Sequence, residues 1–269
     1  MTKKNDFQVA SHVQLLNNEV RIFIEDNPSN EDYLEDDTMT LSEVSKLYNT
    51  LIDNGRVLQT INPINVWSGV IPVVNKDWIL FSVKPHEYLN GGVLDVFGGY
   101  LKPKTTPFEN AIERLSKQLV IYDVKAKKIK VFEFADHLIH HYKKLLYGKY
   151  GFVVNDVEII DENSHTFVSI DNMSKIKTYV NGQLKEENNG YVVFDFDKNL
   201  MSIYFVLLVK DIDVNSTVFI YNEYGGELAH LSHMDIIERS RGAYFNGTLK
   251  SAIKEVLKNR KFFHHPLIL

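Results

Sequence analysis

Three basic side chains, Lys102, Arg114 and Lys117, follow a pair of glycines, Gly98 and Gly99, within one short stretch of the chain. Adjacent glycines carry no side chains, so a ligand can approach their backbone closely. Guanidinium and ammonium groups hold phosphate directly through charge-assisted hydrogen bonds. These residues predict a site for an anionic ligand that needs no metal ion. The alternative is a polar helix face on which the same cations are only solvated.

Two carboxylates in the same stretch could hold a cation instead. Glu109 and Glu113 are four residues apart, so a helix places them on one side. Carboxylate oxygens are ligands of Mg²⁺, but two carboxylates alone rarely make a tight site. The alternative roles are a helix cap for Glu109 and an ion pair with Lys117 for Glu113. We expect no metal and no cofactor, with Mg²⁺ at Glu109 and Glu113 as the alternative.

Histidines form a second candidate metal site. His137, His140 and His141 recur at i, i+3 and i+4 of a predicted helix, beside Asp136, which could bring two imidazoles to one metal ion. Nothing else in this stretch supplies a third ligand at a recognisable spacing. The pattern therefore favours histidines that pack or cap the helix.

A helix is predicted to position the basic side chains. Thr106 suits the N-cap, Pro107 suits the first helical position, and Glu109 completes a capping box with Thr106. Apolar residues then recur at helical spacing, and the pattern predicts a helix over residues 106–120. It is expected to pack through Phe108, Ile112, Leu115 and Leu119. The flank beside this stripe carries Asn110, Arg114, Lys117 and Gln118.

Strands are predicted around this helix. Residues 66–74 and 78–83 form a hairpin, and an apolar run over residues 92–97 leads into the glycine pair. Residues 201–209 are apolar almost throughout, as in a buried strand, and a strand over 218–221 follows. Ser232 opens a short helix, and Thr248 is expected to cap a last helix that runs to residue 258.

The stretch over residues 98–121, GGYLKPKTTPFENAIERLSKQLVI, resembles the Nudix box. The glycines, turn residues and helix-core residues of that motif are matched by Gly98, Gly99, Pro103, Thr106, Pro107, Ala111, Ile112, Leu115, Leu119 and Ile121. The family's carboxylates are not matched. Lys102 stands at its loop glutamate, and its Gly-Glu, Arg-Glu and Glu-Glu pairs are replaced by Lys104-Thr105, Glu113-Arg114 and Lys117-Gln118.

The resemblance implies an α/β fold, a Nudix-like α/β/α sandwich with a mixed sheet, over residues 58–269. Residues 1–57 are then an N-terminal extension, with a strand at 20–24 and a helix at 40–53. Residues 134–196 are a large insertion, a lid or a partner-binding surface. Around and within it the pattern predicts a strand or strand pair over 124–134, a helix over 135–147, and strands over 152–160, 166–170, 177–180 and 191–196. Asn181-Gly182 predicts a hairpin turn.

The resemblance further implies a nucleotide or nucleotide-derived phosphate as the ligand. Because the metal-holding carboxylates are missing, we expect binding without metal-dependent hydrolysis, in a sensor, sequestering or regulatory role. The expected ligand-binding residues are Gly98, Gly99, Tyr100, Lys102, Arg114, Lys117 and Gln118. One alternative is an active hydrolase of nucleoside diphosphate derivatives that recruits Glu109, Glu113, Glu223 and Glu227. Another is a protein-binding domain without a small-molecule ligand.

Composition narrows the class of protein. With 44% hydrophobic and 24% charged residues, the 269-residue chain is typical of globular proteins, and its net charge of −5 argues against general affinity for nucleic acid. It has no cysteine, which excludes disulfides and thiolate sites. No apolar run reaches a membrane span, and the first six residues are polar, so a soluble cytoplasmic protein is expected. The apolar residues 262–269 are expected to dock on the same domain or on a second copy in a homodimer.

Overall fold

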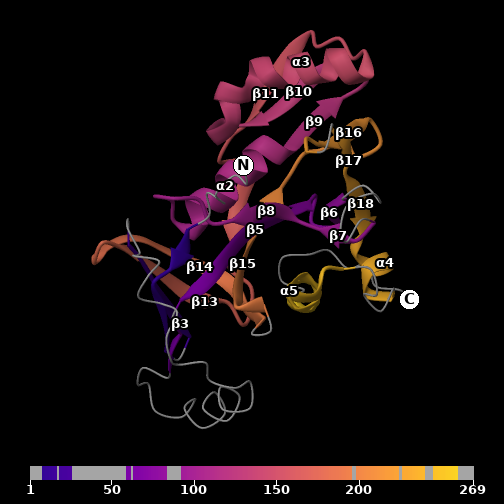
Figure 1. Ribbon diagram of the computed structural model, residues 1–269. Helices are drawn as coiled ribbons and strands as arrows, with labels where there is room; N and C mark the ends of the chain where they lie inside the picture. The colour runs from indigo at the N-terminus through magenta and orange to yellow at the C-terminus, as the bar shows by residue number, and fades with distance from the viewer. Residues whose placement is uncertain are drawn as a thin grey trace. The chain divides into compact units, whose positions relative to one another are not determined.

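The computed structural model describes residues 8–16, 18–25, 59–61, 63–83, 92–195, 198–223, 226–239 and 245–259, drawn as coloured ribbon in Figure 1. The chain divides into two units. The first unit comprises Met1–Ser68, Gly99–Asn110 and Asn172–Tyr204. The second comprises Gly69–Gly98, Ala111–Asp171 and Phe205–Leu269. Each unit therefore combines segments that are far apart in the sequence.

The sheet of the first unit joins strands near the N-terminus with strands that lie within and just after the predicted insertion. Its order is β15-β14-β13-β3-β2-β4. The strands are β2 (His12–Leu16), β3 (Glu19–Ile24), β4 (Gln59–Ile61), β13 (Ser174–Val180), β14 (Gln183–Asp195) and β15 (Leu200–Val209). β3 and β13 are parallel and the other neighbours are antiparallel, so the sheet is mixed. Figure 1 shows indigo β3 beside orange β13.

Two local predictions for this sheet are confirmed. The strand predicted at residues 20–24 is β3, in which buried and half-buried residues alternate as expected for a strand with one covered face. The hairpin turn between β13 and β14 lies at Asn181 and Gly182, with φ angles of 48° and 76°. Two consecutive positive φ values are the geometry of the type I′ turn that this dipeptide favours.

The first and second units share β5 (Ile64–Val74), which pairs antiparallel with β1 (Val9–Ala10) through its first residues. In the second unit, β5 forms the predicted hairpin with β6 (Trp78–Val83). β6 also pairs with β7 (Leu94–Asp95) and β18 (His230–His233), and β12 (His165–Val168) pairs with the last residues of β15. β8 (Phe97–Tyr100) carries the glycine pair and pairs with β5.

A five-stranded sheet in the second unit has the order β11-β10-β9-β16-β17. Its strands are β9 (Leu119–Asp123), β10 (Lys128–Phe132), β11 (Asp156–Ile160), β16 (Thr217–Tyr221) and β17 (Glu227–Leu228). β10 and β11 are parallel, and the other pairs are antiparallel. Parallel neighbours need a crossover, which is supplied by a 3₁₀ helix, η1 (Glu133–Leu138), and by α3 (Ile139–Tyr150). Figure 1 shows α3 running alongside β10 and β11.

The helix of the glycine-pair segment is α2 (Pro107–Gln118). Its capping box is confirmed, because the Glu109 N–H donates to Thr106 Oγ1 at 3.2 Å and the Thr106 N–H donates to Glu109 Oε2 at 2.9 Å. Ala111 and Leu115 are buried, whereas Phe108 and Ile112 are half-buried. The predicted end at residue 120 is wrong. Leu119 is already part of strand β9, where it pairs with Tyr221 of β16. Its side chain is therefore buried by the sheet and not by the packing of α2.

Other boundaries also differ from the prediction. The segment predicted as strand at 124–134 contains a turn before β10, and the predicted helix at 135–147 is divided into η1 and α3. Thr248 is not the cap of α5 (Gly247–Lys258), because the N-cap residue is Asn246. The Asn246 amide does not cap the helix either; it donates to Asp95 Oδ2 at 3.1 Å. The short helix after Ser232 is α4 (Met234–Arg239).

The mixed α/β class is confirmed by these mixed sheets and helices. The predicted boundary at residues 57 and 58, the helix at 40–53 and the apolar segment 262–269 lie outside the described residues. The segment 134–196 contributes residues to both units. Among the described residues, no helix combines the length and the apolar character needed to cross a membrane.

Candidate functional site

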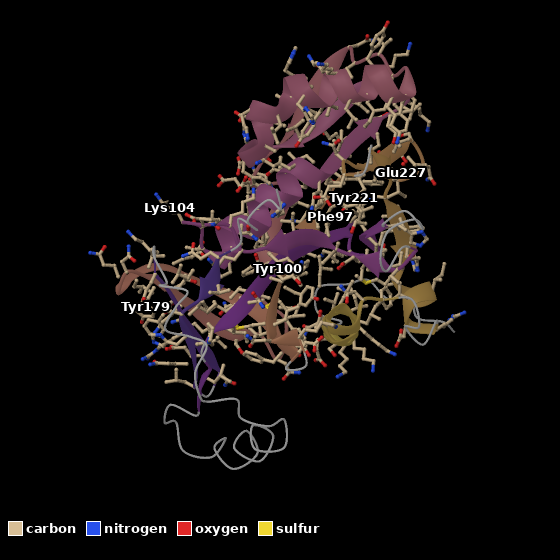
Figure 2. All side chains as sticks on the ribbon, viewed as in Figure 1. Phe97, Tyr100, Lys104, Tyr179, Tyr221 and Glu227 are labelled. Atoms are coloured by element: carbon tan, nitrogen blue, oxygen red, sulfur yellow. The ribbon has the colours of Figure 1, made fainter. Side chains whose placement is uncertain are left out.

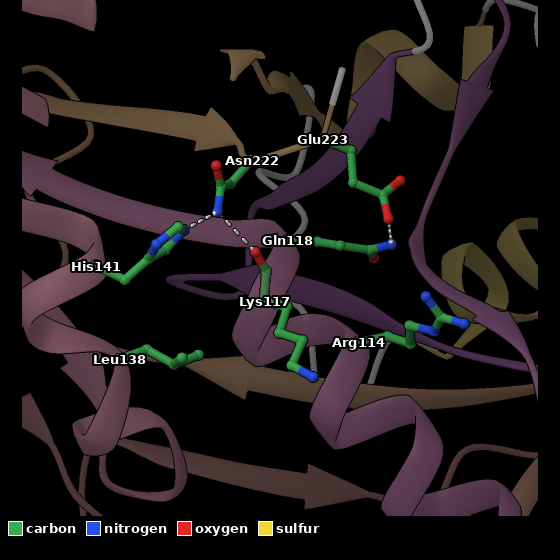
Figure 3. A pocket seen from close by; sticks show the side chains of 7 residues that line it. All are labelled: Arg114, Lys117, Gln118, Leu138, His141, Asn222 and Glu223. Atoms are coloured by element: carbon green, nitrogen blue, oxygen red, sulfur yellow. Dashed lines mark hydrogen bonds between the residues drawn. The ribbon is translucent and has the colours of Figure 1, made fainter. Parts of the chain in front are cut away.

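A cavity of about 340 Å³ lies within the second unit (Figure 3). Seven residues from three parts of the chain line it: Arg114, Lys117 and Gln118 of α2, Leu138 of η1, His141 of α3, and Asn222 and Glu223 after β16. Its volume is near the lower end of the roughly 300–1,000 Å³ found for small-molecule sites. The cavity is therefore large enough for a small ligand.

The carboxyl end of α2 is held by residues of the opposite wall. The Asn222 backbone N–H donates to the Gln118 carbonyl at 2.6 Å, and Asn222 Nδ2 donates to the Lys117 carbonyl at 3.1 Å. The buried Tyr142 hydroxyl donates to the Ser116 carbonyl, and burial raises the pKa of this phenol. The last carbonyls of a helix have no partner within the helix. These bonds satisfy them and orient the flank that faces the cavity.

His141 is joined to the same network. Asn222 Nδ2 also lies 3.1 Å from His141 Nε2, as the dashed lines in Figure 3 show. An amide nitrogen only donates, so Nε2 is the acceptor in this contact. The contact therefore holds the His141 ring at the cavity wall.

The Gln118 side-chain amide has hydrogen-bond partners for its nitrogen but none among the described residues for its oxygen. Its Nε2 donates to the Gly98 carbonyl at 3.0 Å and to Glu223 Oε1 at 2.8 Å, which uses both amide hydrogens. Its Oε1 is buried and has no hydrogen-bond partner among the described residues. Glu223 Oε2 accepts from the Tyr221 hydroxyl, and the Tyr221 ring meets Phe97 edge to face with centroids 6.0 Å apart. Figure 2 labels Phe97 and Tyr221.

Arg114 is a cation without a partner among the residues that the structure describes. Within that part of the chain, its buried Nε has no hydrogen-bond acceptor and its guanidinium makes no ion pair. Burying such a group without a partner destabilises the folded state, and native proteins rarely do so without a reason. The arrangement leaves a guanidinium available to an anion in the cavity.

Lys117 is already paired. Its Nζ lies 2.5 Å from Glu113 Oε1, as the i, i+4 spacing predicted. Both side chains are substantially exposed, and exposed ion pairs of this kind stabilise by about 0–1 kcal/mol. A ligand anion that approaches Lys117 can therefore compete with Glu113 at little energetic cost.

The structure brings together some of the predicted ligand-binding residues. Arg114, Lys117 and Gln118 line the cavity, and Gly98 contacts Gln118 through its carbonyl. Gly99, Tyr100 and Lys102 belong to the first unit.

Asn110 of α2 forms hydrogen bonds to the loop of the first unit. It is fully buried, and its Nδ2 donates to the Gly99 carbonyl at 3.2 Å and to Ser68 Oγ at 2.9 Å. Its Oδ1 accepts from the Lys102 backbone N–H at 3.3 Å. Tyr100, labelled in Figure 2, is 40% exposed. The Asn110 amide is thus taken up by the loop, and Asn110 is not among the residues that line the cavity.

The candidate acids have separate roles. Glu109 caps α2, Glu113 pairs with Lys117, and Glu227 lies 3.2 Å from Lys149. Of the described residues that line the cavity, Glu223 alone is a carboxylate, and it shares the cavity with two cations. Mg²⁺ prefers an octahedron of oxygens that usually includes one or two carboxylates together with waters or phosphates. A single carboxylate beside Arg114 and Lys117 does not fit such a centre.

The three histidines do not form the metal site that their spacing could have made. His137 lies in η1, with Nδ1 3.9 Å from Asp136 Oδ1, whereas His140 and His141 lie in α3. Within the described parts of the chain, no three His, Asp or Glu side chains gather as metal ligands.

One wall of the cavity was not predicted from the sequence. Leu138 and Asn222 were not named as site residues, His141 was named only as a candidate metal ligand, and Glu223 was named only as an acid for the hydrolase alternative. The available signal was weak: Asn222 and Glu223 directly follow an apolar strand, where a polar pair can line a site. Their meeting with α2 depends on the pairing of β16 with β9, which no local pattern encodes.

Comparisons with known proteins assign no family. No protein-family model matches the chain, and no curated protein matches its sequence. Among solved structures, a Nudix hydrolase from Nitrosomonas europaea is similar with a TM-score of 0.35 and 12% sequence identity, over 76% of this chain and 93% of that one. At this TM-score and identity, the likeness establishes neither a family nor an activity for the chain.

Proposed function

We propose that this protein binds a nucleotide or nucleotide-derived phosphate compound in the α2 cavity, without a metal ion, and that it acts as a sensor, a sequestering protein or a regulatory subunit. The observation that carries the proposal is Arg114, whose buried Nε has no acceptor. A planar guanidinium presents a fork of N–H donors that matches the oxygens of a phosphate. A phosphate beside Arg114 supplies the missing acceptor and neutralises the charge.

Lys117 supports the same proposal as a second cation on the cavity wall. Its ammonium has three N–H donors, and its exposed bond to Glu113 is weak. Arg114 and Lys117 lie three residues apart on α2, so both project from one side of the helix toward the cavity. Two cations on one flank favour a ligand with more than one negative charge.

Hydrolysis that depends on Mg²⁺ is less well supported. The proposed phosphate contacts come from the cations Arg114 and Lys117, which repel a divalent ion. The hydrolase alternative has only Glu223 among its four named acids at the cavity, within the described residues. We therefore expect no magnesium-dependent turnover of nucleotides by the purified protein.

The test is equilibrium binding of ATP, ADP and AMP, measured by calorimetry and by the shift in melting temperature, with EDTA present. Binding should survive EDTA and weaken as salt rises, because the contacts are ionic. Arg114→Ala should weaken it by about tenfold or more, since a hydrogen bond to a charged group contributes roughly 1.5–3 kcal/mol. A nucleotide at 100 times its Kd stabilises the protein by about 2.7 kcal/mol, which a melting experiment detects.

Lys144→Ala is the matched control, because Lys144 is an exposed lysine of α3 that does not line the cavity. It should leave affinity unchanged within about twofold. Binding that requires Mg²⁺, or that is indifferent to Arg114→Ala combined with Lys117→Ala, would contradict the proposal. Magnesium-stimulated release of phosphate that Glu223→Gln abolishes would instead support the hydrolase alternative.

A further inference from the structure

The cavity presents acceptors as well as cations. Gln118 is 3% exposed, and its Oε1 has no hydrogen-bond donor. Its Nε2 is held by Gly98 and Glu223, so the amide cannot rotate to exchange the two ends without losing both bonds. Native proteins rarely leave such a carbonyl oxygen unsatisfied, so its lone pairs favour a ligand that brings a hydrogen-bond donor.

Glu223 adds a second acceptor beside the first. A carboxylate has about four lone-pair sites. In the structure Glu223 accepts from Tyr221 and from Gln118, which leaves lone pairs for further donors. Figure 3 shows the Glu223 carboxylate bonded to the Gln118 amide at the cavity wall, with Arg114 projecting from the same side of α2 as Gln118.

A ligand made of phosphate groups alone does not match this combination of cations and hydrogen-bond acceptors. Ionised phosphate oxygens accept hydrogen bonds but hardly donate them, so they would leave Gln118 Oε1 unsatisfied and would be repelled by Glu223. A ligand that carries hydroxyl donors next to its phosphate matches both groups. An ammonium donor would also suit Glu223, but the two cations Arg114 and Lys117 disfavour it.

We infer that the cavity recognises a sugar phosphate unit, with Arg114 on the phosphate and with Gln118 Oε1 and Glu223 on the sugar hydroxyls. This inference rests on the proposed phosphate-binding function of the same cavity. The volume of about 340 Å³ suits a unit of this size. Gln118 and Glu223 are then specificity-determining residues, whereas Arg114 provides affinity for any phosphate monoester.

The first experiment compares two phosphate monoesters in the wild-type protein. Ribose 5-phosphate carries hydroxyl donors, and butyl phosphate carries none. Calorimetry in EDTA should give an affinity for ribose 5-phosphate at least about tenfold higher, which corresponds to one charge-assisted hydrogen bond. Phosphoethanolamine, in which an ammonium replaces the hydroxyls, should bind no better than butyl phosphate.

The second experiment uses Glu223→Gln and predicts effects of opposite sign. Loss of the carboxylate should weaken ribose 5-phosphate binding by about tenfold. The same change removes a negative charge from the cavity, so butyl phosphate should bind equally well or more tightly. Glu227→Gln makes the same change in charge at a residue that does not line the cavity, and it should alter neither affinity by more than about twofold.

The possible failures are distinguishable. Equal affinity of the wild type for the two monoesters, with both lost in Arg114→Ala, would overturn the inference and leave the proposed phosphate site intact. An equal loss of both ligands in Glu223→Gln would mean that Glu223 shapes the cavity instead of recognising hydroxyls. If neither monoester nor any nucleotide binds, the proposed function fails and the inference with it. Should Glu223→Gln not fold, the comparison of ligands in the wild type decides.

Discussion

Two polar atoms of neighbouring side chains, Arg114 Nε and Gln118 Oε1, are buried and have no partners in the part of the chain that the structure describes. One is a donor and the other an acceptor, and both residues line the same cavity. A protein selected only for stability would replace such groups or pair them, because each unsatisfied group destabilises the folded state. At the scale of single residues, this destabilisation distinguishes a ligand-binding helix flank from a helix face that is only solvated, because solvated side chains are satisfied by water.

Replacing Arg114 by Met should therefore stabilise the ligand-free protein. Met keeps most of the aliphatic stem and removes the buried Nε that has no acceptor among the described residues, so we expect the free energy of unfolding to rise by about 1 kcal/mol. Urea unfolding at neutral pH measures this change. Lys117→Met is the control and should change stability by less than about 0.5 kcal/mol, since its ion pair is exposed. A large destabilisation by Arg114→Met would reveal a structural role for the guanidinium.

Glu186 in β14 predicts a pH dependence of stability. Burial raises its pKa above the ordinary value of 4.5, and the charge of Glu109 adds to the effect, although hydrogen bonds from Thr106 and Phe108 oppose it. A raised pKa means that the folded state holds the proton more tightly than the unfolded state. This contribution to stability is fully present below pH 4.5 and is lost as the pH rises through the folded pKa.

Glu186→Gln removes that titration. The free energy of unfolding of the variant, relative to the wild type, should rise as the pH increases from about 4 towards neutrality. Urea unfolding of both proteins across this pH range measures the difference between their free energies of unfolding. The contributions of the other titrating groups cancel in that difference. A difference that is constant with pH would show that the hydrogen bonds from Thr106 and Phe108 offset the effect of burial, and one that moves the opposite way would show that they outweigh it.

At the scale of secondary-structure elements, the two ends of α2 are held by different kinds of contact. Thr106 and Glu109 cap the amino end reciprocally within one turn of chain. The carboxyl end depends on Tyr142 and Asn222, which are distant in sequence. Since the cavity flank lies in the last two turns, its geometry depends on the distant residues more than on the cap.

Thr106→Ala should lower the free energy of unfolding by about 1 kcal/mol, within the roughly 0.5–2 kcal/mol known for N-caps. The side-chain acceptor for the Glu109 N–H is lost, and the alanine cannot replace it. Thr106→Ser, which keeps the hydroxyl, should recover most of the loss. Nucleotide affinity at the other end of α2 should stay within about twofold. An equal loss in both variants would assign the effect to the buried methyl group.

At the scale of the whole molecule, stability depends on a core assembled from distant segments. Leu115 of α2, Phe81 of β6, Ile129 of β10 and Ile253 of α5 are buried in the second unit, each with at most 1% exposure. In a close-packed interior, deleting such a side chain removes apolar contacts and leaves a cavity. The apolar stripe of α2 is therefore needed for folding as well as for orienting the basic flank.

Leu115→Ala should cost about 2–5 kcal/mol of unfolding free energy. Leu228→Ala is the control, because Leu228 is 59% exposed, and it should cost less than about 0.5 kcal/mol. Denaturant unfolding of both variants provides the measurement. Equal effects of the two substitutions would contradict the assignment of Leu115 to the core.

The sequence by itself determined those features whose causes are local. The capping box of Thr106 and Glu109, the hairpin turn at Asn181-Gly182 and the ion pair of Glu113 with Lys117 each involve residues within four positions of one another. Helix and turn geometry bring such neighbours together in any fold that contains them. The flank of Arg114, Lys117 and Gln118 followed from helical periodicity in the same way.

Only the tertiary structure decided what that flank faces. Leu119 continues a helical apolar stripe, yet it belongs to β9, because pairing with β16 satisfies its backbone and buries its side chain. The same pairing places Asn222 and Glu223 against the end of α2, some 105 positions along the chain. Contacts at such separations depend on which strands pair and on how the core packs. Strand pairing and core packing are decided by free-energy differences summed over the whole chain, which no local stretch of sequence contains.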